Sequence, residues 1–457
     1  MPDLIKVAKF GGTSMADYTA MTRCASIIKK DPDKKVIVVS ATAGTTNLLT
    51  GLSNTENPDD RIIYLDQIRD KHDSILKKLK KTADIQPEVD KLLSELENMA
   101  SFKGEFSLKQ KDQLLSIGER LSSTIFTGVL NEAGMSAAWF DARKIIKTDD
   151  NYGSAEPDIE AIKQACEDKI SHKLKDHRIV TQGFIGSDPE GFTTTLGRGG
   201  SDYSAALIAE GIHADVLEIW TDVSAVFTTD PRLVPEAKPI TEISFNEAAE
   251  LSVFGAKVLH PATLKPAIRK NIKVYVGSSI HPDEPGTWIV KNTREKPVIR
   301  AISVRRNQTL LTVHSLDMLH RHGFLARLFQ ILAEYKISVD LVTTSEVNVS
   351  LTLDTDIMAP GRNYLSESII AKLKEFSDVT VERELSLIAL VGNNLHTTSG
   401  LSGPVFSALE DINIRLICHG ASQHNLCFLV EENKAKEVVS ILHQRFILTV
   451  PEKFSGT

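Results

Sequence analysis

The chain has few cysteines, few aromatic residues and no long hydrophobic run. Its 457 residues include four cysteines, none of them in a Cys-X-X-Cys pair or beside clustered histidines, which argues against a zinc site and against a disulfide framework. No stretch approaches 18 apolar residues, and no apolar core with a cleavage site follows Met1. We therefore expect no membrane span and no targeting signal, and a location in a reducing cytoplasm.

Blocks of like charge are also missing. The 53 basic and 60 acidic residues give a net charge of −7, and no run of five or more like charges interrupts their mixing. A phosphate-backbone footprint is thus absent, which excludes nucleic acid and anionic membranes as expected partners. The apolar fraction of 42% and the charged fraction of 25% are those of a folded globular protein, and the length predicts two to four domains.

What the sequence does contain, over its first 290 residues, is an alternation of short β-branched runs with helical patterns. This alternation is typical of βα units on a mainly parallel sheet that helices cover on both faces. The clearest predicted strands are residues 36–39, 178–181, 216–220 and 273–276, and the clearest amphipathic helices lie within residues 62–79 and 92–99. These helices are expected to cover the sheet.

The last third of the chain repeats itself. Turn-forming residues mark a boundary at 281–297, and a shift of 77 residues then aligns Leu310 with Leu387 and Phe329 with Phe406. Each copy is predicted as a small βαββ module; the first has its elements at residues 309–313, 324–335, 338–343 and 348–353. Duplicated modules outside a catalytic core commonly bind ligands or subunits, and a purely structural repeat is the alternative.

The first candidate site is Lys9-Phe10-Gly11-Gly12-Thr13-Ser14, at the end of the first predicted strand and before a helix predicted over residues 16–29. Two glycines let the backbone approach an anion, and a helix N-terminus offers free N–H groups to it. The loop is therefore a candidate phosphate cradle, although a tight turn also requires glycine. It differs from a Walker A loop because its lysine precedes the glycines.

A second glycine loop, Thr195-Leu196-Gly197-Arg198-Gly199-Gly200-Ser201-Asp202, precedes a helical run predicted over residues 203–212. Arg198 can grip a carboxylate with two hydrogen bonds, Ser201 can donate to a substrate, and Asp202 can orient Mg²⁺ or a lysine. The structural alternative makes Asp202 a helix cap and Arg198 a solvated surface cation.

Two further loops complete the set. Trp220-Thr221-Asp222 ends a predicted strand and should share the crevice at the carboxyl edge of the sheet. Phe254-Gly255-Ala256-Lys257-Val258-Leu259-His260-Pro261 supplies Lys257, which together with Lys9 would neutralise a polyphosphate. His260 precedes a proline in a rigid turn and is better explained as a packed residue than as a catalyst.

In order and spacing, these four motifs resemble those of the aspartate kinases of the amino-acid kinase superfamily, and the tandem modules resemble their ACT domains. The resemblance covers essentially the whole chain and is strongest to the lysine-sensitive, single-function type. It implies an α/β amino-acid kinase fold, with a mainly parallel sheet sandwiched by helices, followed by two ferredoxin-like ACT modules. The implied domains are residues 1–295 for catalysis, 296–385 for the first ACT module and 386–457 for the second.

The resemblance also implies the reaction. ATP, with Mg²⁺, would phosphorylate the β-carboxylate of L-aspartate to 4-phospho-L-aspartate, the first step toward lysine, threonine and methionine. The implied catalytic residues are Lys9 and Asp202. The implied ATP contacts are Lys9, Gly11, Gly12, Thr13, Thr221, Asp222, Phe227, Arg232, Lys257 and Val258. The implied aspartate contacts are Thr46, Glu119, Arg198 and Ser201. Relatives usually have Tyr where this chain has Phe227, so a contact there would rest on packing.

An inhibitory site for L-lysine is implied in the first module. Its residues would be Met318, Gly323, Phe324, Leu325, Ser338, Val339, Asp340, Ser345 and Glu346. The second module has Ile417 and Gln423 at the positions of Asp340 and Glu346, so it lacks both carboxylates and is expected to form contacts between modules. The structural alternative for Asp340 and Glu346 is an exposed strand charge. The resemblance further implies a homodimer through the ACT modules, with association to a tetramer when lysine binds.

Two other functions stay open from the sequence. Another amino-acid kinase, acting for example on glutamate, would share the phosphate loops but should lack the paired modules. A catalytically inactive amino-acid-binding regulatory protein would keep the modules but lose Lys9, Asp202 or Lys257, and all three are present. The effector is also open, because threonine or no effector at all fits the residue types.

Overall fold

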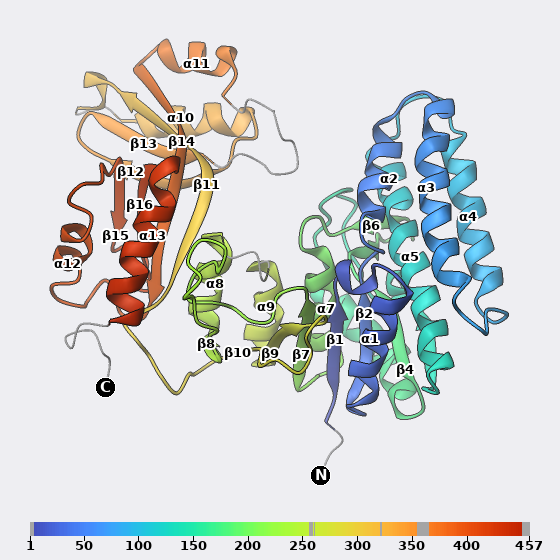
Figure 1. Ribbon diagram of the computed structural model, residues 1–457. Helices are drawn as coiled ribbons and strands as arrows, with labels where there is room; N and C mark the ends of the chain where they lie inside the picture. The colour runs from blue at the N-terminus through green and yellow to red at the C-terminus, as the bar shows by residue number, and fades with distance from the viewer. Residues whose placement is uncertain (1–3, 256–258, 260, 320–321, 354–364, 450–457) are drawn as a thin grey trace. The chain divides into compact units, whose positions relative to one another are not determined.

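The computed structural model describes residues 4–255, 259, 261–319, 322–353 and 365–449 (Figure 1). The chain folds into two compact units. The first unit comprises residues 1–226, 239–252 and 257–293; the second comprises residues 227–238, 253–256 and 294–457. Two short segments that interrupt the first unit therefore belong to the second.

The first unit is built on an eight-stranded sheet of order β3-β4-β2-β1-β7-β9-β10-β8. Neighbouring strands are parallel except for β9 and β10, which are antiparallel. The strands of this sheet are β1 (Lys6–Phe10), β2 (Lys34–Val39), β3 (Ala137–Phe140), β4 (Arg178–Gln182), β7 (Val216–Thr221), β8 (Glu242–Ser244), β9 (Lys273–Ser278) and β10 (Thr287–Val290). A separate hairpin pairs β5 (Ile185–Ser187) with β6 (Thr193–Thr195).

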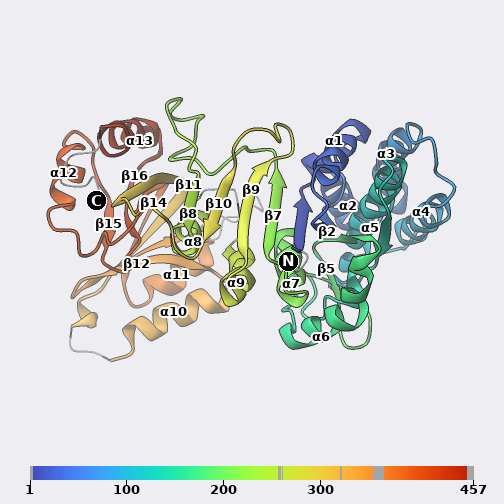
Figure 2. The same cartoon turned by 90° about the horizontal axis from the view of Figure 1, so that it is seen from below.

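The central strands β1, β2 and β7 are largely buried on both faces, which suits the apolar residues that make up most of β2 and β7. Figure 2 shows α1 and α5 on one face of the sheet and α6, α7 and α9 on the other. These helices are α1 (Tyr18–Lys29), α5 (Leu108–Glu132), α6 (Ile159–Lys169), α7 (Gly200–Gly211) and α9 (Pro261–Lys270). The four predicted strands and the helix-covered parallel sheet are confirmed.

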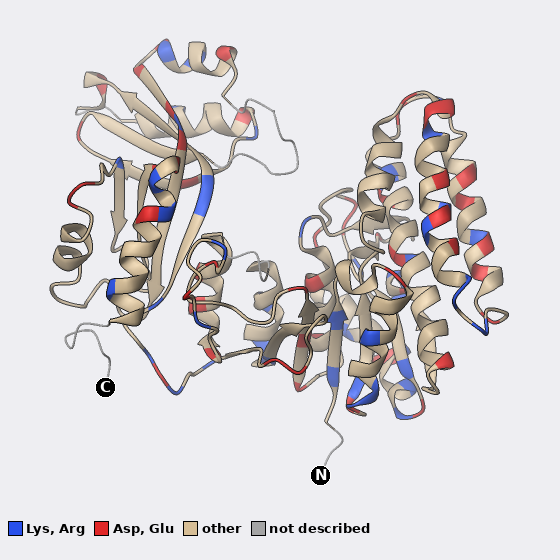
Figure 3. Cartoon of the chain, in the orientation of Figure 1, with Lys and Arg blue, Asp and Glu red and all other residues tan. Residues whose placement is uncertain are grey.

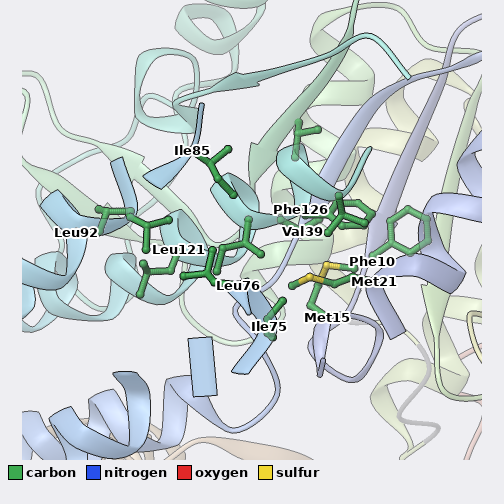
Figure 4. Packing of buried hydrophobic residues seen from close by; sticks show 14 of the residues in the cluster. Phe10, Met15, Met21, Val39, Ile75, Leu76, Ile85, Leu92, Leu121 and Phe126 are labelled. Carbon is green, nitrogen blue, oxygen red and sulfur yellow. The ribbon is translucent and has the colours of Figure 1, made fainter. Parts of the chain in front are cut away.

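Three more helices extend the α5 side of the sheet: α2 (Thr45–Asn54), α3 (Pro58–Leu76) and α4 (Gln86–Ala100). Together with α1 and α5 they enclose a core that includes Phe10, Met21 and Phe126 (Figure 4). Acidic and basic residues are interspersed along these helices (Figure 3). The pattern over residues 62–79 thus does form a helix that covers the core, although the helix begins earlier because Asn57 caps it and Pro58 starts it.

Two further helix starts differ from those predicted, and one strand was not predicted. Helix α1 begins at Tyr18, with Asp17 as its cap, because a 3₁₀ turn at Thr13–Met15 intervenes after the glycine loop. Helix α7 begins at Gly200, three residues earlier than predicted, so Asp202 lies in its first turn. Strand β10 lies inside the turn-rich segment 281–297, where its short length made it invisible to periodicity.

The second unit contains a six-stranded sheet of order β12-β13-β11-β14-β16-β15, in which all neighbours are antiparallel. Its strands are β11 (Ile299–His314), β12 (Val339–Thr344), β13 (Asn348–Leu353), β14 (Asp378–Gly392), β15 (Leu416–His419) and β16 (Asn425–Glu431). Its helices are α10 (Phe324–Glu334), α11 (Glu367–Lys374), α12 (Ser402–Ser407) and α13 (Ala435–His443).

The predicted duplication is visible in this sheet. Strands β13 and β16 begin at Asn348 and Asn425, which are 77 residues apart, and each closes a strand–helix–strand–strand copy. One apolar cluster lies under α10 and α11, and another lies under α12 and α13. Each copy therefore buries its own core, while the long central strands β11 and β14 join the copies into one sheet.

The segment 227–238 packs on the second module. Val234 belongs to the apolar cluster under α13, and the Thr228 hydroxyl lies 2.9 Å from Nε2 of the buried His443. Burial lowers the pKa of His443, which keeps its imidazole neutral.

Within the described residues, no helix is both long enough and apolar enough to cross a membrane.

Candidate functional site

The predicted site residues of the first unit gather at one edge of its sheet. Strands β1, β2 and β7 run parallel and end at Phe10, Val39 and Thr221, so the loops that follow them meet at their carboxyl ends. In open α/β sheets this edge is where ligands bind. The glycine loop after Phe10, the loop before α2 and the Thr221-Asp222 turn all lie there.

Lys9 and Asp202 form an ion pair at the centre of this edge. Lys9 lies on β1 between Val38 of β2 and Ile219 of β7, and the residue is 8% exposed. Its Nζ atom lies 2.5 Å from Oδ1 of Asp202, which α7 presents from its first turn. An acidic side chain is stabilised there by the helix dipole. The pair therefore holds one largely buried cation at the point where the phosphate cradle was predicted.

The glycine loop runs close to its neighbours, which explains its composition. The Gly11 N–H donates to the Trp220 carbonyl at 3.1 Å, and a Cβ atom on Gly12 would lie 3.2 Å from the Ala41 carbonyl oxygen. Thr13 begins the 3₁₀ turn, and the buried Ser14 hydroxyl lies 2.7 Å from that of Ser279. The loop is therefore anchored to the ends of β7 and β9, and the expected helix N-terminus is replaced by a 3₁₀ turn.

Glu119 is buried, and among the described residues only one of its two carboxyl oxygens has a hydrogen-bond partner. It lies on α5 with 3% exposure, and its Oε1 accepts a hydrogen bond of 3.2 Å from the Ala41 N–H. Within the described part of the chain its Oε2 has no hydrogen-bond partner. Burial raises the pKa of Glu119 to about 8, although the Ala41 N–H and the positive charge of Lys9 oppose the rise. A buried carboxyl group with an unpartnered oxygen can receive a hydrogen-bond donor or, once ionised, a cation.

Thr45 was missed by the sequence reasoning. Its side chain is fully buried at the start of α2, and its Oγ1 has no hydrogen-bond partner among the described residues. It lies against Gly118, where a Cβ atom would be 3.4 Å from its Cγ2. The predicted residue, Thr46, is one position further on and partly exposed. No periodicity distinguishes two successive threonines, so the signal that separates them is burial.

Arg198 stands between two left-handed glycines. Gly197 and Gly199 have φ angles of 70° and 71°, and Arg198 itself is exposed. Ser201 follows in the first turn of α7 and lies against Gly183, where a Cβ atom would be 2.7 Å from the Cα of Ser201. The glycines therefore serve the close approach of α7 to the end of β4 and the sharp turn that exposes Arg198.

Phe184 is a second residue that the sequence reasoning missed. Its φ angle is 70°, an uncommon and strained value for an aromatic residue, and it follows Gly183 at the end of β4. Its N–H donates to the Ser204 hydroxyl at 2.9 Å, and its carbonyl accepts from the Leu196 N–H at 2.9 Å. Strain of this kind is held where surrounding contacts fix the backbone, here beside the Arg198 loop.

The predicted nucleotide contacts are not all in one unit. The Thr221 hydroxyl donates to Asp222 Oδ1 at 3.1 Å in the first unit. Phe227 and Arg232 belong to the second unit, where Arg232 is paired with Asp230 at 2.7 Å and lowers the pKa of that carboxyl group. The predicted Lys257 and Val258, like His260, lie outside the described residues.

The predicted lysine site lies on one module of the second unit. Gly323, with a φ angle of 88°, precedes α10, so the N–H groups of its first turn are available near Phe324 and Leu325. Asp340 lies on β12, and its Oδ2 is 3.2 Å from Nη2 of Arg305. The other predicted residues lie in the 3₁₀ turn after β11, just before or on β12, and in the β12–β13 turn: Met318, Ser338, Val339, Ser345 and Glu346.

No group of three or more His, Cys, Asp or Glu side chains gathers as a metal site within the ranges that the structure describes.

Two family models match the chain. The model described as the amino acid kinase family matches residues 5–278. The model described as an ACT domain matches residues 311–368 and again residues 388–446. The matches confirm both parts of the resemblance, including the duplicated module.

Curated and solved relatives agree with these matches. The lysine-sensitive aspartokinase 3 of Escherichia coli (strain K12) is 49% identical over 441 residues, which is 96% of this chain and 98% of that protein. Aspartokinase 3 of Arabidopsis thaliana, chloroplastic, is 36% identical over 467 residues, 97% of this chain and 82% of that protein. The crystal structure of E. coli aspartokinase III in complex with aspartate and ADP superposes with a TM-score of 0.87 at 49% identity, covering 96% of this chain and 99% of that chain.

A second crystal structure, of E. coli aspartokinase III in complex with lysine and aspartate, superposes with a TM-score of 0.84 at 48% identity, covering 97% of this chain and 99% of that chain. The chain therefore belongs to the amino acid kinase family of phosphotransferases, with two ACT domains after the kinase fold. Within that family it belongs to the aspartokinases.

Proposed function

We propose that the chain transfers the γ-phosphoryl group of ATP to the β-carboxylate of L-aspartate and is inhibited by L-lysine. The observation that carries the substrate assignment is the buried Glu119 with its free Oε2, beside the Lys9–Asp202 pair. The first group can receive an ammonium ion and the second can receive a phosphoryl group. An amino acid that is phosphorylated on its side-chain carboxylate can place its ammonium group at Glu119 and its reacting carboxylate near Lys9.

No general base is required for this reaction. A carboxylate with an ordinary pKa near ~3.9 is already ionised at neutral pH and can attack directly. The difficulty is repulsion between an anionic nucleophile and a polyanionic donor, which cations and N–H groups must offset. Lys9 neutralises the transferring phosphoryl group, Asp202 orients Lys9, and the backbone of Gly11, Gly12 and Thr13 cradles the phosphates.

Mg²⁺ enters this reaction with its substrate, ATP. One carboxylate together with substrate phosphates and water is a common donor set for Mg²⁺ in phosphotransferases. Asp202 provides a carboxylate beside Lys9, so the donor chemistry of this edge fits a metal carried by the nucleotide.

Aspartate is held at both ends in this proposal. Glu119 pairs with its α-ammonium, and Arg198 and Ser201 bind a carboxylate. A threonine at the start of α2 donates a hydroxyl group; the sequence favours Thr46, and the buried Thr45 hydroxyl, which has no partner among the described residues, supports Thr45 as well. The adenosine side of the site is assigned to Thr221, Asp222, Phe227, Arg232, Lys257 and Val258.

Lysine inhibition is assigned to the first ACT module. The free N–H groups at the start of α10 suit the carboxylate of an amino acid, and Asp340 and Glu346 suit its ammonium groups. Because Arg305 already pairs with Asp340, the effector's ammonium competes with a guanidinium for that carboxylate. Inhibition is then a population shift, in which lysine favours a module packing that disfavours catalysis.

A homodimer through the ACT modules is part of the proposal, with a tetramer when lysine binds. Strand β12 is an edge strand, and most of its side chains are exposed, including Val342 at 43%. An exposed edge strand is a ready template for pairing with a second chain. The domain boundaries after residues 295 and 385 and the cytoplasmic location stay predictions from the sequence.

A hydroxamate trap tests the substrate assignment. Hydroxylamine converts an acyl phosphate to a hydroxamate, which forms a coloured complex with iron(III), so the purified chain is incubated with MgATP, hydroxylamine and either aspartate, glutamate or acetylglutamate. We expect product with aspartate alone. Product with glutamate alone would replace the assignment by the alternative kinase, and no product with any acid would favour the inactive regulatory protein.

A further inference from the structure

Helix α5 carries a buried polar seam that faces the site. Asp112, Ser116, Glu119 and Ser123 are spaced by four, three and four residues, which places them on one face of the helix. All four are buried, with exposures between 0% and 3%. The opposite face of α5 packs in the apolar core through Leu114, Leu121 and their neighbours. Charged and polar side chains that are buried in this way are retained where they hold something.

Asp112, at the start of this seam, holds two loops at once. Its Oδ2 accepts from the N–H of Gly153 at 2.9 Å and from the N–H of Thr195 at 2.8 Å. Its Oδ1 accepts from the Thr195 hydroxyl at 2.8 Å. Every partner is a donor, so the ionised carboxylate satisfies them all. Burial raises the pKa of Asp112, and these three donors oppose the rise.

The loop that Asp112 holds leads directly to Arg198. The Thr195 carbonyl accepts from the Ala155 N–H at 2.9 Å, and the Leu196 N–H donates to the Phe184 carbonyl at 2.9 Å. The chain is thus fixed on several sides at Thr195 and Leu196. Only Gly197 separates this fixed point from Arg198, and glycine alone would leave the arginine poorly positioned.

The same helix therefore sets both ends of the substrate site. Asp112 and Glu119 are seven residues apart on α5, which corresponds to a rise of about 10 Å along the helix. Glu119 presents the free carboxylate oxygen for the ammonium, while Asp112 fixes the loop that carries the carboxylate-binding Arg198 and Ser201.

We propose that Asp112 is a positioning residue for aspartate recognition: through Thr195 it fixes the Arg198 loop relative to Glu119. The proposal rests on the proposed function, because it takes Arg198 and Glu119 as the aspartate contacts. In this proposal Asp112 does not contact the substrate. A merely structural Asp112 would instead affect the fold or both substrates alike.

Steady-state kinetics of Asp112→Asn test the proposal. The amide keeps the size of the side chain but places an NH₂ group against N–H or O–H donors. We expect the KM for aspartate to rise at least about tenfold, since small displacements of a positioning group have effects of that size or larger. The KM for MgATP should change less than about twofold. An unchanged KM for aspartate, or an equal rise in both KM values, would overturn the proposal.

Two further comparisons separate positioning from folding. Thr195→Val deletes only the hydroxyl donor to Asp112 and should raise the KM for aspartate. Thr195→Ser keeps that hydroxyl and should leave the KM for aspartate near the wild-type value. Ser116→Ala is the matched control, because Ser116 lies on the same buried seam but donates only to the Gln113 carbonyl of its own helix, at 2.7 Å. If Asp112→Asn does not fold, equal KM values in the valine and serine variants overturn the proposal.

The activity of the wild-type chain distinguishes failure of the proposed function from failure of the positioning role. If the wild-type chain does not phosphorylate aspartate, the proposed function fails. If it does, and the Asp112 and Thr195 variants leave the KM for aspartate unchanged, the positioning role alone fails.

Discussion

At the scale of single residues, the proposed chemistry depends on a buried lysine and a partly exposed aspartate that the sheet and helix α7 bring to one edge. Lys9 comes from the centre of the sheet and Asp202 from the first turn of α7, nearly two hundred residues later in the chain. Their ion pair is 2.5 Å long, and the two side chains are 10% and 17% exposed. In such surroundings an electrostatic contact is worth far more than at the surface, which suits stabilisation of a transferring phosphoryl group.

Replacing Lys9 by methionine should abolish most of the chemistry but little of the aspartate binding. Removing one preorganised donor from a transition state typically costs about 100-fold or more in kcat. We expect a kcat loss of that order with a KM for aspartate within about threefold, measured by steady-state kinetics. Lys30→Met is the control, because Lys30 forms an exposed pair with Asp283. A Lys9→Met enzyme with normal kcat would remove Lys9 from the mechanism.

The residue scale is also where the sequence alone was least sufficient. The motifs predicted Lys9, Asp202 and Arg198 because glycines mark unusual backbone. Glu119 lies inside an ordinary helical pattern, where a glutamate is usually solvated, and only the match to a family motif singled it out. Thr45, Phe184 and Asp112 have no local signal at all. Thr45 is distinguished by burial, and Asp112 and Phe184 by hydrogen bonds to other segments of the chain, which no spacing records.

At the scale of elements, the predicted strands were found where β-branched runs placed them, because strands buried on both faces must be apolar throughout. Helix starts were less predictable. The helix predicted from residue 16 begins at Tyr18, since the chain first makes a 3₁₀ turn that anchors Ser14 beside β9. Strand β10 was missed, because four residues inside a turn-rich segment give no periodicity.

Asp340→Ala tests whether strand β12 contributes to the site of lysine inhibition. The substitution removes a carboxylate from the predicted effector site and leaves the kinase fold untouched. We expect activity without lysine within about twofold of wild type, and an inhibitory lysine concentration at least tenfold higher. The measurement is the initial rate across a lysine titration.

Ile417→Ala is the control for this titration, because Ile417 occupies the equivalent position of the second module and is exposed. It should leave inhibition unchanged. If Asp340→Ala instead loses activity while inhibition persists, the lysine site lies elsewhere.

At the scale of the whole molecule, the sequence predicted a kinase fold followed by a duplicated module, and the two copies with their 77-residue offset are present in one six-stranded sheet. It did not predict that residues 227–238 group with that sheet. Their position follows from packing of Val234 and from the Thr228–His443 contact, whose two members are far apart in the chain. Sequence patterns report local periodicity and cannot report such pairings.

The assembly prediction also belongs to the whole molecule. Light scattering of the lysine-free protein should give about twice the chain mass of 50.3 kDa. Val342→Lys, on the exposed edge strand β12, should lower the measured mass toward one chain. Ile62→Lys is a control, because Ile62 is a similarly exposed apolar residue on helix α3 of the first unit. A wild-type mass of one chain at micromolar concentration would contradict the proposed dimer.

The central claim is that Glu119 receives the ammonium of aspartate. With its pKa raised to about 8 by burial, Glu119 is mostly protonated at pH 7 in the free protein and must ionise to pair with an ammonium. The pKa of Glu119 is higher in the folded protein than in the unfolded chain. At pH values between these two pKa values, folding therefore favours the protonated, neutral carboxyl group. Glu119→Gln should therefore fold with at least wild-type stability.

Titration calorimetry of aspartate binding at pH 7, repeated in buffers of different ionisation enthalpy, measures this proton directly. The account predicts release of nearly one proton per aspartate by the wild-type protein, a release that disappears above about pH 9, and none by Glu119→Gln. Binding without proton release at pH 7, or equal release by both proteins, would contradict it.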